Sequence, residues 1–429
     1  MFRKLWLFLA AALCAAVLLG PAVPAQAADV TLDVYYANPS FATFYEQIAQ
    51  EFMKRNPGIA IQFRAPAPTY DVGQQTMLRQ AITSQLPDVD FTSFSFMPEL
   101  VRALVKRDQI LDLGPLLQNE GAAWVAANYT QNTLDLAKVD GKQFGIAFNA
   151  SLPIGYVNAD LVRKAGGDPD KLPADWTGLL GIAKKINAIG GGVSGVGYSV
   201  QVWPDDWLWQ AIVMQSGARI LDASGTKVGF GGPPGLDVMK LLRSVVTEGG
   251  MPLMDFDQAR EAFVAGKTGI YFDTPARLKQ VTDLVATRFV LKTFVFPIND
   301  TAHGGLPTGG NAGIITTKDP AKQKAAWAYI KFMTGPEAQT IVAKATGYMP
   351  LNLNAAGPNF LKPFYDANPN FATVAKEVDR ALPWQGYPGG NSVRIWRLQR
   401  DIINGVMSGD ITPEAGLKQI VDQTNALMQ

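Results

Sequence analysis

The sequence predicts an α/β fold with enough chain for two lobes. From Ala28 onward, strand-like runs alternate with amphipathic helical patterns. Helical patterns dominate from Pro320 to the C-terminus, and no internal repeat or low-complexity linker interrupts the chain. The 429 residues are 48% apolar and 17% charged, which is the composition of a globular protein with a large core. Alternating strands and helices are typical of layered α/β architecture.

The N-terminal segment has the features of a secretory signal peptide over residues 1–27. Two basic residues precede an apolar run over residues 5–19, which is followed by Gly-Pro and by small residues ending at Ala27. The run is too short for a membrane anchor, which needs about 20 apolar residues. We therefore expect cleavage between Ala27 and Ala28 and a periplasmic protein.

Cleavage removes the only cysteine, Cys14, whose lipidation the sequence leaves open. It also removes two basic residues, so that the formal charge changes from 38 − 37 = +1 to 36 − 37 = −1. A chain so close to neutral gives no electrostatic reason to expect nucleic acid as a partner. No later segment reaches membrane-spanning length without a charge. We expect a soluble monomer.

Five short runs rich in Val, Ile, Tyr and Phe are predicted as strands. They cover residues 30–36, 59–63, 89–96, 144–149 and 268–272. A helix is predicted after the first of them, over residues 42–58, because Phe44, Ile48 and Phe52 recur at helical spacing and Gly58 ends the pattern.

A cluster of indoles and carboxylates interrupts this pattern, with Trp203, Asp205, Asp206, Trp207 and Trp209 inside seven residues. Pro204 followed by two carboxylates predicts a helix that begins at Pro204 and runs to Gly217. Trp203 and Trp207 would flank the start of this helix, and Trp209 would face the core. The two flanking indoles are either core residues or a platform that stacks on the C–H face of a sugar or polyol.

The chain after residue 27 lacks the residues of the commonest catalytic and metal sites. It has no cysteine, and its only histidine is His303 in a Gly-rich loop. The usual zinc, copper and iron sites cannot be built from these residues, and no G-x-S-x-G motif accompanies the histidine. Gly190–Gly195 matches G-x-G-x-x-G, but it follows a helical segment and is interpreted as a turn. We expect no metal and no cofactor.

Paired carboxylates leave one enzymatic alternative open. Asp205 with Asp206, or Asp88 with Asp90, could supply the acid and base of glycoside hydrolysis if their spacing in the fold is suitable. The alternative is therefore a secreted carbohydrate-active enzyme that uses an aspartate pair. The favoured interpretation is a binding protein that is not an enzyme.

Five segments together resemble the extracellular solute-binding proteins of bacterial ABC importers, in the group that includes maltose-binding protein. They are FYEQIAQEFMKRNPGIAIQF, the run from DGKQFGIAFNASLP to LLGIAKKI, AFVAGKTGIYF, the run from KDPAKQKAAW to TGYMPLN, and MSGDITPEAGLKQI. Each segment alone is weak, but five in this order are specific. Among subgroups the chain is most similar to the glycerol-3-phosphate-binding proteins, with which it shares FNASLP, TGYMPL, FYDANPNFATV and GGNSVRIWR.

The resemblance implies two α/β lobes joined by three crossings, with the ligand bound in the cleft between them and closure about the hinge. Lobe 1 would comprise residues 28–147 and 276–346, and lobe 2 residues 148–275 and 347–429. The crossings would lie near residues 147–149, 272–275 and 347–350.

The resemblance also implies which residues bind the ligand. The residues at matching positions are Tyr70, Ser151, Trp203, Trp207, Gly310, Tyr348 and Arg394. Ser151 would reach a phosphate or hydroxyls, Gly310 would offer its backbone N–H, and Arg394 would pair with an anionic group. Arg397 competes with Arg394 for this role, because the register needs a gap of one residue.

One departure from the subgroup leaves the ligand open. Where the subgroup carries a glutamate that receives the glycerol hydroxyls, this chain reads Ser93, Phe94 and Ser95. Asp273 or Thr274 could supply hydroxyl contacts instead. The expected ligand is therefore a polyol, a phosphorylated polyol such as glycerol 3-phosphate or a glycerophosphodiester, or a sugar. The expected partners are this solute and the transmembrane subunits of an ABC permease.

Overall fold

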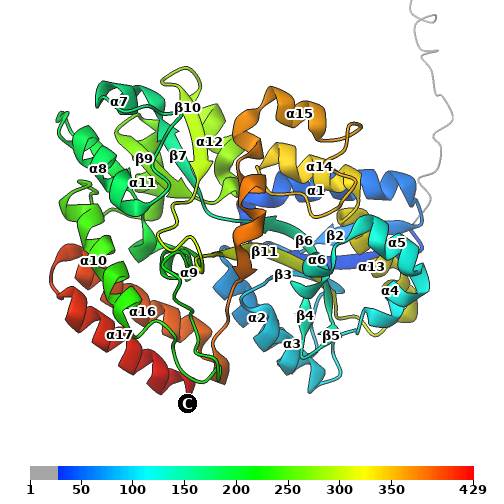
Figure 1. Ribbon diagram of the computed structural model, residues 1–429. Coiled ribbons are helices and arrows are strands. Elements are labelled where there is room, and N and C mark those ends of the chain that lie inside the picture. The colour runs from blue at the N-terminus through cyan, green and yellow to red at the C-terminus, as the bar shows by residue number, and fades with distance from the viewer. Residues whose placement is uncertain (1–27) are drawn as a thin grey trace, which may run out of the picture.

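The computed structural model describes residues 28–429, so the predicted signal peptide and its cleavage site lie outside the described residues. Two lobes, each built on its own β-sheet, lie side by side (Figure 1). This confirms the two-lobed α/β fold. Among the described residues, no helix is both long and apolar enough to cross a bilayer.

The first lobe is built on a six-stranded sheet. Its strand order is β12-β11-β3-β1-β2, and β6 also pairs with β11. Strand β1 runs parallel to β2 and β3, whereas β11 runs antiparallel to β3 and β6. The strands are β1 (Val30–Tyr36), β2 (Ile59–Phe63), β3 (Val89–Ser93), β6 (Gly145–Ser151), β11 (Leu306–Ile315) and β12 (Ala381–Pro383).

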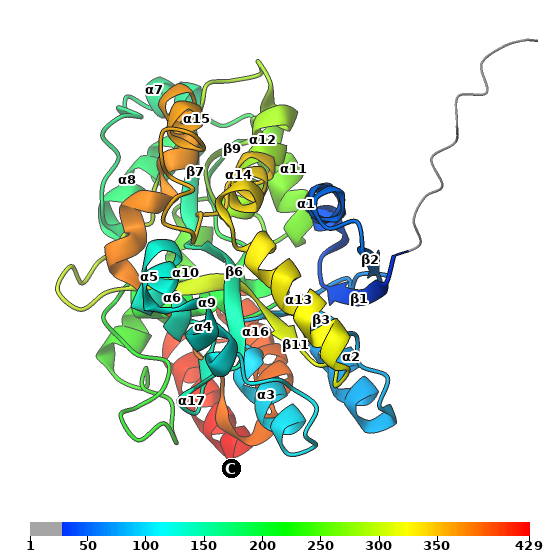
Figure 2. The same ribbon diagram turned by 90° about the vertical axis from the view of Figure 1, so that its right-hand side faces the viewer.

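Helices cover both faces of this sheet, and the sequence of β1 shows why. Alternate residues of a strand point to opposite faces, so Leu32 and Val34 pack in one core while Tyr35 packs in the other. Helix α13 lies along β1 and β11 (Figure 2). The helices are α1 (Ala42–Arg55), α2 (Tyr70–Thr83), α3 (Met97–Val105), α4 (Gly114–Glu120), α5 (Ala122–Asn128), α6 (Gln131–Asp135), α13 (Pro320–Met333) and α14 (Pro336–Ala345). A short hairpin joins β4 (Lys138–Val139) to β5 (Lys142–Gln143).

The second lobe is built on a four-stranded sheet with the order β10-β7-β9-β8. Its strands are β7 (Ile154–Asn158), β8 (Ser194–Gly197), β9 (Thr268–Asp273) and β10 (Leu291–Val295). Its helices are α7 (Ala159–Lys164), α8 (Trp176–Asn187), α9 (Trp207–Met214), α10 (Pro233–Thr247), α11 (Phe256–Val264), α12 (Leu278–Val285), α16 (Ser392–Ser408) and α17 (Pro413–Met428). Helices α10, α16 and α17 pack together near the C-terminus (Figure 1).

The pairing of β10 places the boundary between the lobes at a different point from the one expected from the sequence. The expected division assigned residues 276–346 to lobe 1, but β10 pairs antiparallel with β7 along its whole length and so belongs to the second sheet. We therefore propose that the chain returns to the first lobe along β11. Leu306 at the start of β11 packs in the second-lobe core, and Ile315 at its end packs in the first-lobe core.

The other two crossings are proposed on the same basis. The chain leaves the first sheet at Ser151 and enters the second at Ile154. The last crossing lies between Tyr348, in the first-lobe core, and Phe371, in the second-lobe core. This segment contains α15 (Lys362–Ala367).

Candidate ligand-binding site

The cluster of tryptophans lies where the lobes meet, and its helix begins later than the sequence predicts. Helix α9 starts at Trp207, whereas Pro204 was expected in its first position. Residues 204–206 form a bend that follows Trp203, which is extended with φ −63° and ψ 142°. The bend places Asp205 in the cleft, where it lines the cavity. Trp209 is fully buried and packs edge-on against Phe230, so its predicted inward orientation is confirmed.

Residues from both lobes line a cavity of about 90 Å³, which we call the inner compartment. Seven of the nine predicted ligand-binding residues line it, namely Tyr70, Ser151, Trp203, Trp207, Thr274, Gly310 and Tyr348. Tyr70 lies in α2, Ser151 in β6, Gly310 in β11 and Trp207 at the start of α9, with Trp203 just before it. Thr274 follows β9, and Tyr348 follows α14. Segments far apart in the sequence therefore meet at one cavity.

Aromatic rings make up much of the wall of the inner compartment. The rings of Trp203 and Trp207 have centroids 6.2 Å apart at an interplanar angle of 35°. Trp203 also meets Phe256 edge-on at 4.6 Å, and Trp207 lies 6.5 Å from Trp384. The Phe41 ring from the first lobe completes this wall. Such a surface suits the C–H face of a polyol or sugar.

Hydrogen bonds hold several of these side chains in place. The indole Nε1 of Trp207 donates to the carbonyl of Pro307 at 2.9 Å, which ties α9 to β11. The Tyr70 hydroxyl donates to Oδ1 of Asn311 at 3.0 Å, across from α2 to β11. Both rings are thereby oriented before any ligand enters.

Gly310 shapes the wall through its backbone. Its φ is +132°, which a residue with a side chain rarely adopts, and a Cβ there would lie 2.1 Å from the carbonyl oxygen of Asn149. The pairing of β11 with β6 shifts register between Asn311 and Ala312. Glycine at this position therefore allows the close approach of β6 and β11 beside the cavity.

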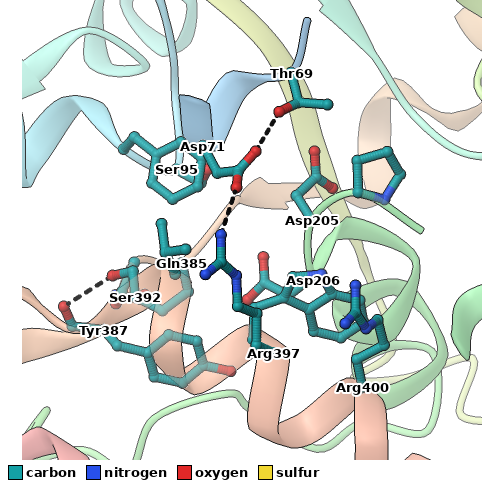
Figure 3. A pocket seen from close by; sticks show the side chains of 15 residues that line it. Thr69, Asp71, Ser95, Asp205, Asp206, Gln385, Tyr387, Ser392, Arg397 and Arg400 are labelled. Atoms are coloured by element: carbon teal, nitrogen blue, oxygen red, sulfur yellow. Dashed lines mark hydrogen bonds and ion pairs between the residues drawn. The ribbon is translucent and has the colours of Figure 1, made fainter. Parts of the chain in front are cut away.

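A second cavity of about 220 Å³ adjoins the first, and we call it the outer compartment (Figure 3). The two compartments share Thr69, Pro204 and Asp205. Arg397 and Arg400, one helical turn apart on α16, line the outer compartment from the second lobe. Figure 3 shows Asp71 between Thr69 and Arg397, and its carboxylate accepts a hydrogen bond from each.

Two buried aspartates stand at the junction of the compartments. Burial and the neighbouring charge of Asp206 raise the pKa of Asp205 to about 8. Burial raises the pKa of Asp206 to about 6, although hydrogen bonds from Gln210 and Trp384 oppose this shift. These bonds, at 2.7 and 2.8 Å, occupy the Asp206 carboxylate within the protein. Asp205 accepts from the backbone N–H of Trp207 at 3.1 Å and faces both compartments.

The structure does not bring Arg394 or Asp273 to the inner compartment. Arg394 is exposed on α16, because the neighbouring Ile395 and Trp396 occupy the buried face, and it lines a separate groove beside α2. Asp273 is fully buried and accepts hydrogen bonds from the Tyr271 hydroxyl and the Thr274 N–H. Of the two competing arginines, Arg397 is the one that lines the cleft.

Sequence reasoning missed several lining residues. Asn38, Phe256, Arg277 and Trp384 line the inner compartment but belong to no motif that would single them out. Asp205 was interpreted as part of a helix start or as one member of a catalytic carboxylate pair, and not as a ligand-binding residue. Arg277 lies three residues after Thr274, and this closeness to an expected contact is the one signal that could have pointed to it.

The structure also shows where the Gly-rich motif at residues 190–195 and the single histidine after residue 27 lie. Residues 190–192 form a turn with positive φ after α8, and no strand precedes them, so Gly190–Gly195 is not a nucleotide-binding loop. His303 is exposed in a loop and lies 3.2 Å from Asp300. Among residues 28–429, no three His, Cys, Asp or Glu side chains come together as a metal-binding group.

Residues 38–340 match the family model of bacterial extracellular solute-binding proteins. The chain belongs to this family. It is the substrate-binding component of an ABC transporter, and the family is one of exported binding proteins. The match covers most of the two lobes described above, including every segment of the inner compartment except those around Tyr348 and Trp384.

Relatives of this solute-binding protein are remote in sequence and similar in fold. It is 24% identical over 304 residues to the sn-glycerol-3-phosphate-binding periplasmic protein of Agrobacterium fabrum, covering 68% of this chain and 69% of the relative. A binding protein of Brucella abortus is 23% identical over 421 residues, with 96% of each chain covered.

Solved structures show the same architecture. UgpB of Mycobacterium tuberculosis, in complex with glycerophosphocholine, superposes with a TM-score of 0.80 at 18% identity, covering 93% of this chain and 98% of the other. An ABC substrate-binding protein of Listeria monocytogenes, in complex with cycloalternan, superposes with a TM-score of 0.78 at 20% identity, covering 93% and 99%. At these identities the likeness concerns the fold.

Proposed function

We propose that this protein captures a small polyol-type solute between its lobes and delivers it to the transmembrane subunits of an ABC permease. The ligand is glycerol 3-phosphate, a glycerophosphodiester or a sugar. The observation that carries the proposal is the meeting of seven predicted ligand-binding residues from both lobes at one aromatic-walled compartment. A cavity that opens between lobes and combines aromatic walls with a few polar groups is the usual form of a small-molecule site.

The polar groups of the compartment suit a polyol. Hydroxyls of Ser151, Thr274 and Tyr348 line it beside the indoles, and the carboxyl of Asp205 stands at its outer end. Hydroxyls both donate and accept hydrogen bonds, and a carboxyl accepts them from a polyol. Asp205 supplies an acceptor in a chain whose Ser93, Phe94 and Ser95 replace the glutamate of the glycerol-3-phosphate-binding subgroup.

The names of relatives support the same class of ligand. One relative is a sn-glycerol-3-phosphate-binding protein, and two proteins of the same fold hold glycerophosphocholine or cycloalternan. We propose further that the mature protein begins at Ala28 and acts as a periplasmic monomer without nucleic acid as a partner. The near-neutral charge supports the last point.

We propose that the protein is not an enzyme. Glycoside hydrolysis needs two carboxyl groups on opposite sides of the scissile bond. Asp206 does not face the inner compartment, and its carboxylate is bound to Gln210 and Trp384. Asp88 accepts from the Asp33 N–H and from Lys322 in the first lobe, away from the cleft. Incubation with oligosaccharides is expected to give no products, and steady turnover would contradict the proposal.

Isothermal titration calorimetry of residues 28–429 tests the binding function. The panel is glycerol 3-phosphate, glycerophosphocholine, glycerol, maltose and trehalose, with inorganic phosphate as a control. We expect saturable binding of at least one organic solute with a stoichiometry of about one, because the lobes enclose one compartment pair. Absence of binding across this panel would contradict the proposed ligand class.

A further inference from the structure

Arg277 is a cation on the wall of the inner compartment that no sequence motif indicates. It ends the short turn Pro275–Arg277 after β9 and is half-buried. Its Nη1 donates to the hydroxyl of Ser40 at 2.9 Å, and its guanidinium carbon lies 5.8 Å from the centroid of the Phe41 ring. Both contacts reach the first lobe, so Arg277 bridges the lobes at the edge of the ligand cavity.

Among residues 28–429 no carboxylate lies within 4.0 Å of the charged group of Arg277, although its charge opposes the rise that burial causes in the pKa of Asp273. The bond to Ser40 uses only one nitrogen of the Arg277 guanidinium. Arg64, which follows β2 in the first lobe, shows the opposite case: Asp33 accepts from its Nε and Nη2, and Gln80 and Gln85 accept from its Nη1. Arg277 therefore keeps donors and charge available toward the compartment.

Apart from Asp205, the other polar side chains that line the inner compartment are hydrogen-bond donors without charge. Ser151, Thr274 and Tyr348 contribute hydroxyls, and Asn38 contributes an amide. A guanidinium in a compartment lined by neutral donors suits a phosphate or carboxylate, since the planar fork matches two oxygens and hydroxyls can take the others. The one carboxyl that lines this compartment, Asp205, belongs to the junction with the outer compartment.

Arg397 differs from Arg277 in each of these respects. It lines the outer compartment and the groove beside α2 but not the inner compartment. Its side chain is 58% exposed, and its Nη2 lies 3.4 Å from Asp71. Solvent and this carboxylate both weaken its attraction for an anion.

We propose that Arg277 binds the anionic group of the ligand, so that the inner compartment selects a polyol that carries a phosphate or carboxylate over a neutral one. This inference rests on the proposed function and names the class of solute within it. Arg277 is then a specificity-determining residue, and Arg394, the residue expected from the family resemblance, is not.

The test compares three probes that share a three-carbon polyol: glycerol 3-phosphate, glycerate and neutral glycerol, with maltose as a larger neutral probe. Calorimetry on residues 28–429 is done for the wild type, Arg277→Gln, Arg277→Lys and Arg394→Gln. We expect the wild type to bind an anionic probe more tightly than glycerol. Arg277→Gln should weaken that binding by about tenfold or more, because a charge-assisted hydrogen bond is lost.

The variants Arg277→Lys and Arg394→Gln distinguish a loss of charge at residue 277 from a general disturbance of the structure. Arg277→Lys should recover part of the affinity, since it keeps the charge and loses the fork, and Arg394→Gln should bind as the wild type does. The loss in Arg277→Gln should also shrink as ionic strength rises. Unfolding temperatures of all variants establish that each one is folded.

The outcomes distinguish the inference from the proposed function. If the wild type binds an anionic probe and Arg277→Gln binds it equally well, the role of Arg277 is wrong and the binding function stands. If the wild type binds only maltose or glycerol, the anionic class is likewise wrong. If the wild type binds none of the four probes and none of the wider panel, the proposed function fails, and the role of Arg277 fails with it.

Discussion

Asp205 has a buried carboxyl whose environment favours the protonated form. With a pKa of about 8, the folded protein holds this proton between about pH 4 and pH 8, whereas the unfolded chain releases it near pH 4. The folded state therefore binds more protons over this range, and the contribution of Asp205 to the free energy of unfolding falls as the pH rises. The contribution of Asp206 to the free energy of unfolding likewise falls as the pH rises, up to about pH 6.

Replacing Asp205 by Asn should remove this pH dependence. Asn keeps an oxygen to accept the Trp207 N–H and carries no ionisable proton. We expect the free energy of unfolding of Asp205→Asn, relative to the wild type, to rise by at least about 1 kcal/mol between pH 5 and pH 8. Urea unfolding without ligand measures it, with the exposed Asp237→Asn as control. Parallel curves for wild type and Asp205→Asn would contradict the buried, protonated state.

Trp203 and Trp209 are both buried, but they differ in what they face. Trp203 lines the inner compartment, whereas Trp209 packs in the core against Phe230. Trp203→Ala should weaken ligand binding by about 2 kcal/mol, or roughly 30-fold, because the stacking surface is lost. Trp209→Phe should leave affinity within about threefold while lowering stability by about 1 kcal/mol or more. Calorimetry and thermal unfolding measure the two effects, and equal loss of affinity in both variants would show that stacking is not specific to Trp203.

A residue of the site could be predicted from the sequence only where it lies in a recognisable motif. Ser151 and Tyr348 were predicted because each sits in a segment shared with the family, and Trp203 because it lies in the cluster of indoles and carboxylates. Arg277 was not found, because nothing in local spacing shows that the turn after β9 reaches across to Ser40. Arg394 lies in the groove beside α2, whereas Arg397, about one turn later on α16, reaches the outer compartment. The family register alone did not decide between the two arginines.

Strand β11 is the element that brings the site together. It pairs with β3 and β6, and it receives the indole bond of Trp207 and the hydroxyl bond of Tyr70. Its path beside β6 depends on Gly310, where no Cβ fits.

Gly310→Ala should therefore destabilise the protein, whereas the same change in a helix should not. A Cβ at Gly310 meets the Asn149 carbonyl at 2.1 Å and the backbone has positive φ, so we expect a loss of about 2 kcal/mol or more. Gly181 lies in α8 with nothing within 4 Å of an added Cβ, and Gly181→Ala should gain about 0.5 to 1 kcal/mol. Chemical unfolding measures both. A Gly310→Ala variant as stable as Gly181→Ala would contradict the described backbone.

At the level of elements, the five predicted strands correspond to β1, β2, β3, β6 and β9, whereas the fully buried β7 and β11 were not predicted. Residues 30–36 and 59–63 were predicted as strands with the observed bounds. Strand β3 ends at Ser93 instead of residue 96, because Phe94–Phe96 turn into α3. Strand β10 was missed since all five of its residues are only partly buried, which gives neither an apolar run nor a clean alternation. Its pairing with β7 depends on contacts distant in sequence.

The whole molecule is two lobes held together at the cleft by few polar side-chain contacts. Arg397 in the Asp71–Arg397 pair and Ser40 in the Arg277–Ser40 bond are exposed to solvent, so each contact contributes little in water. A ligand bound by both lobes adds contacts that only the closed arrangement provides, and it therefore shifts the population toward that arrangement.

Small-angle X-ray scattering of residues 28–429 should detect this shift. We expect the radius of gyration to fall when a solute from the panel saturates the protein, because the lobes approach each other about the crossings. Asp71→Asn should increase the radius of gyration without ligand slightly, by loosening the contact between α2 and α16. A radius of gyration that is the same with and without bound solute would contradict closure.

The central claim is that a solute binds between the lobes at the inner compartment, and thermal unfolding tests it most directly. Residues 28–429 of the wild type and of Trp203→Ala are melted with each solute of the panel at about 1 mM. A dissociation constant near 1 μM adds about 4 kcal/mol to the free energy of unfolding at this excess, which corresponds to several degrees. We predict such a rise for at least one phosphorylated polyol or sugar in the wild type and a much smaller rise in Trp203→Ala. No rise with any solute, or an equal rise in both proteins, would contradict the claim.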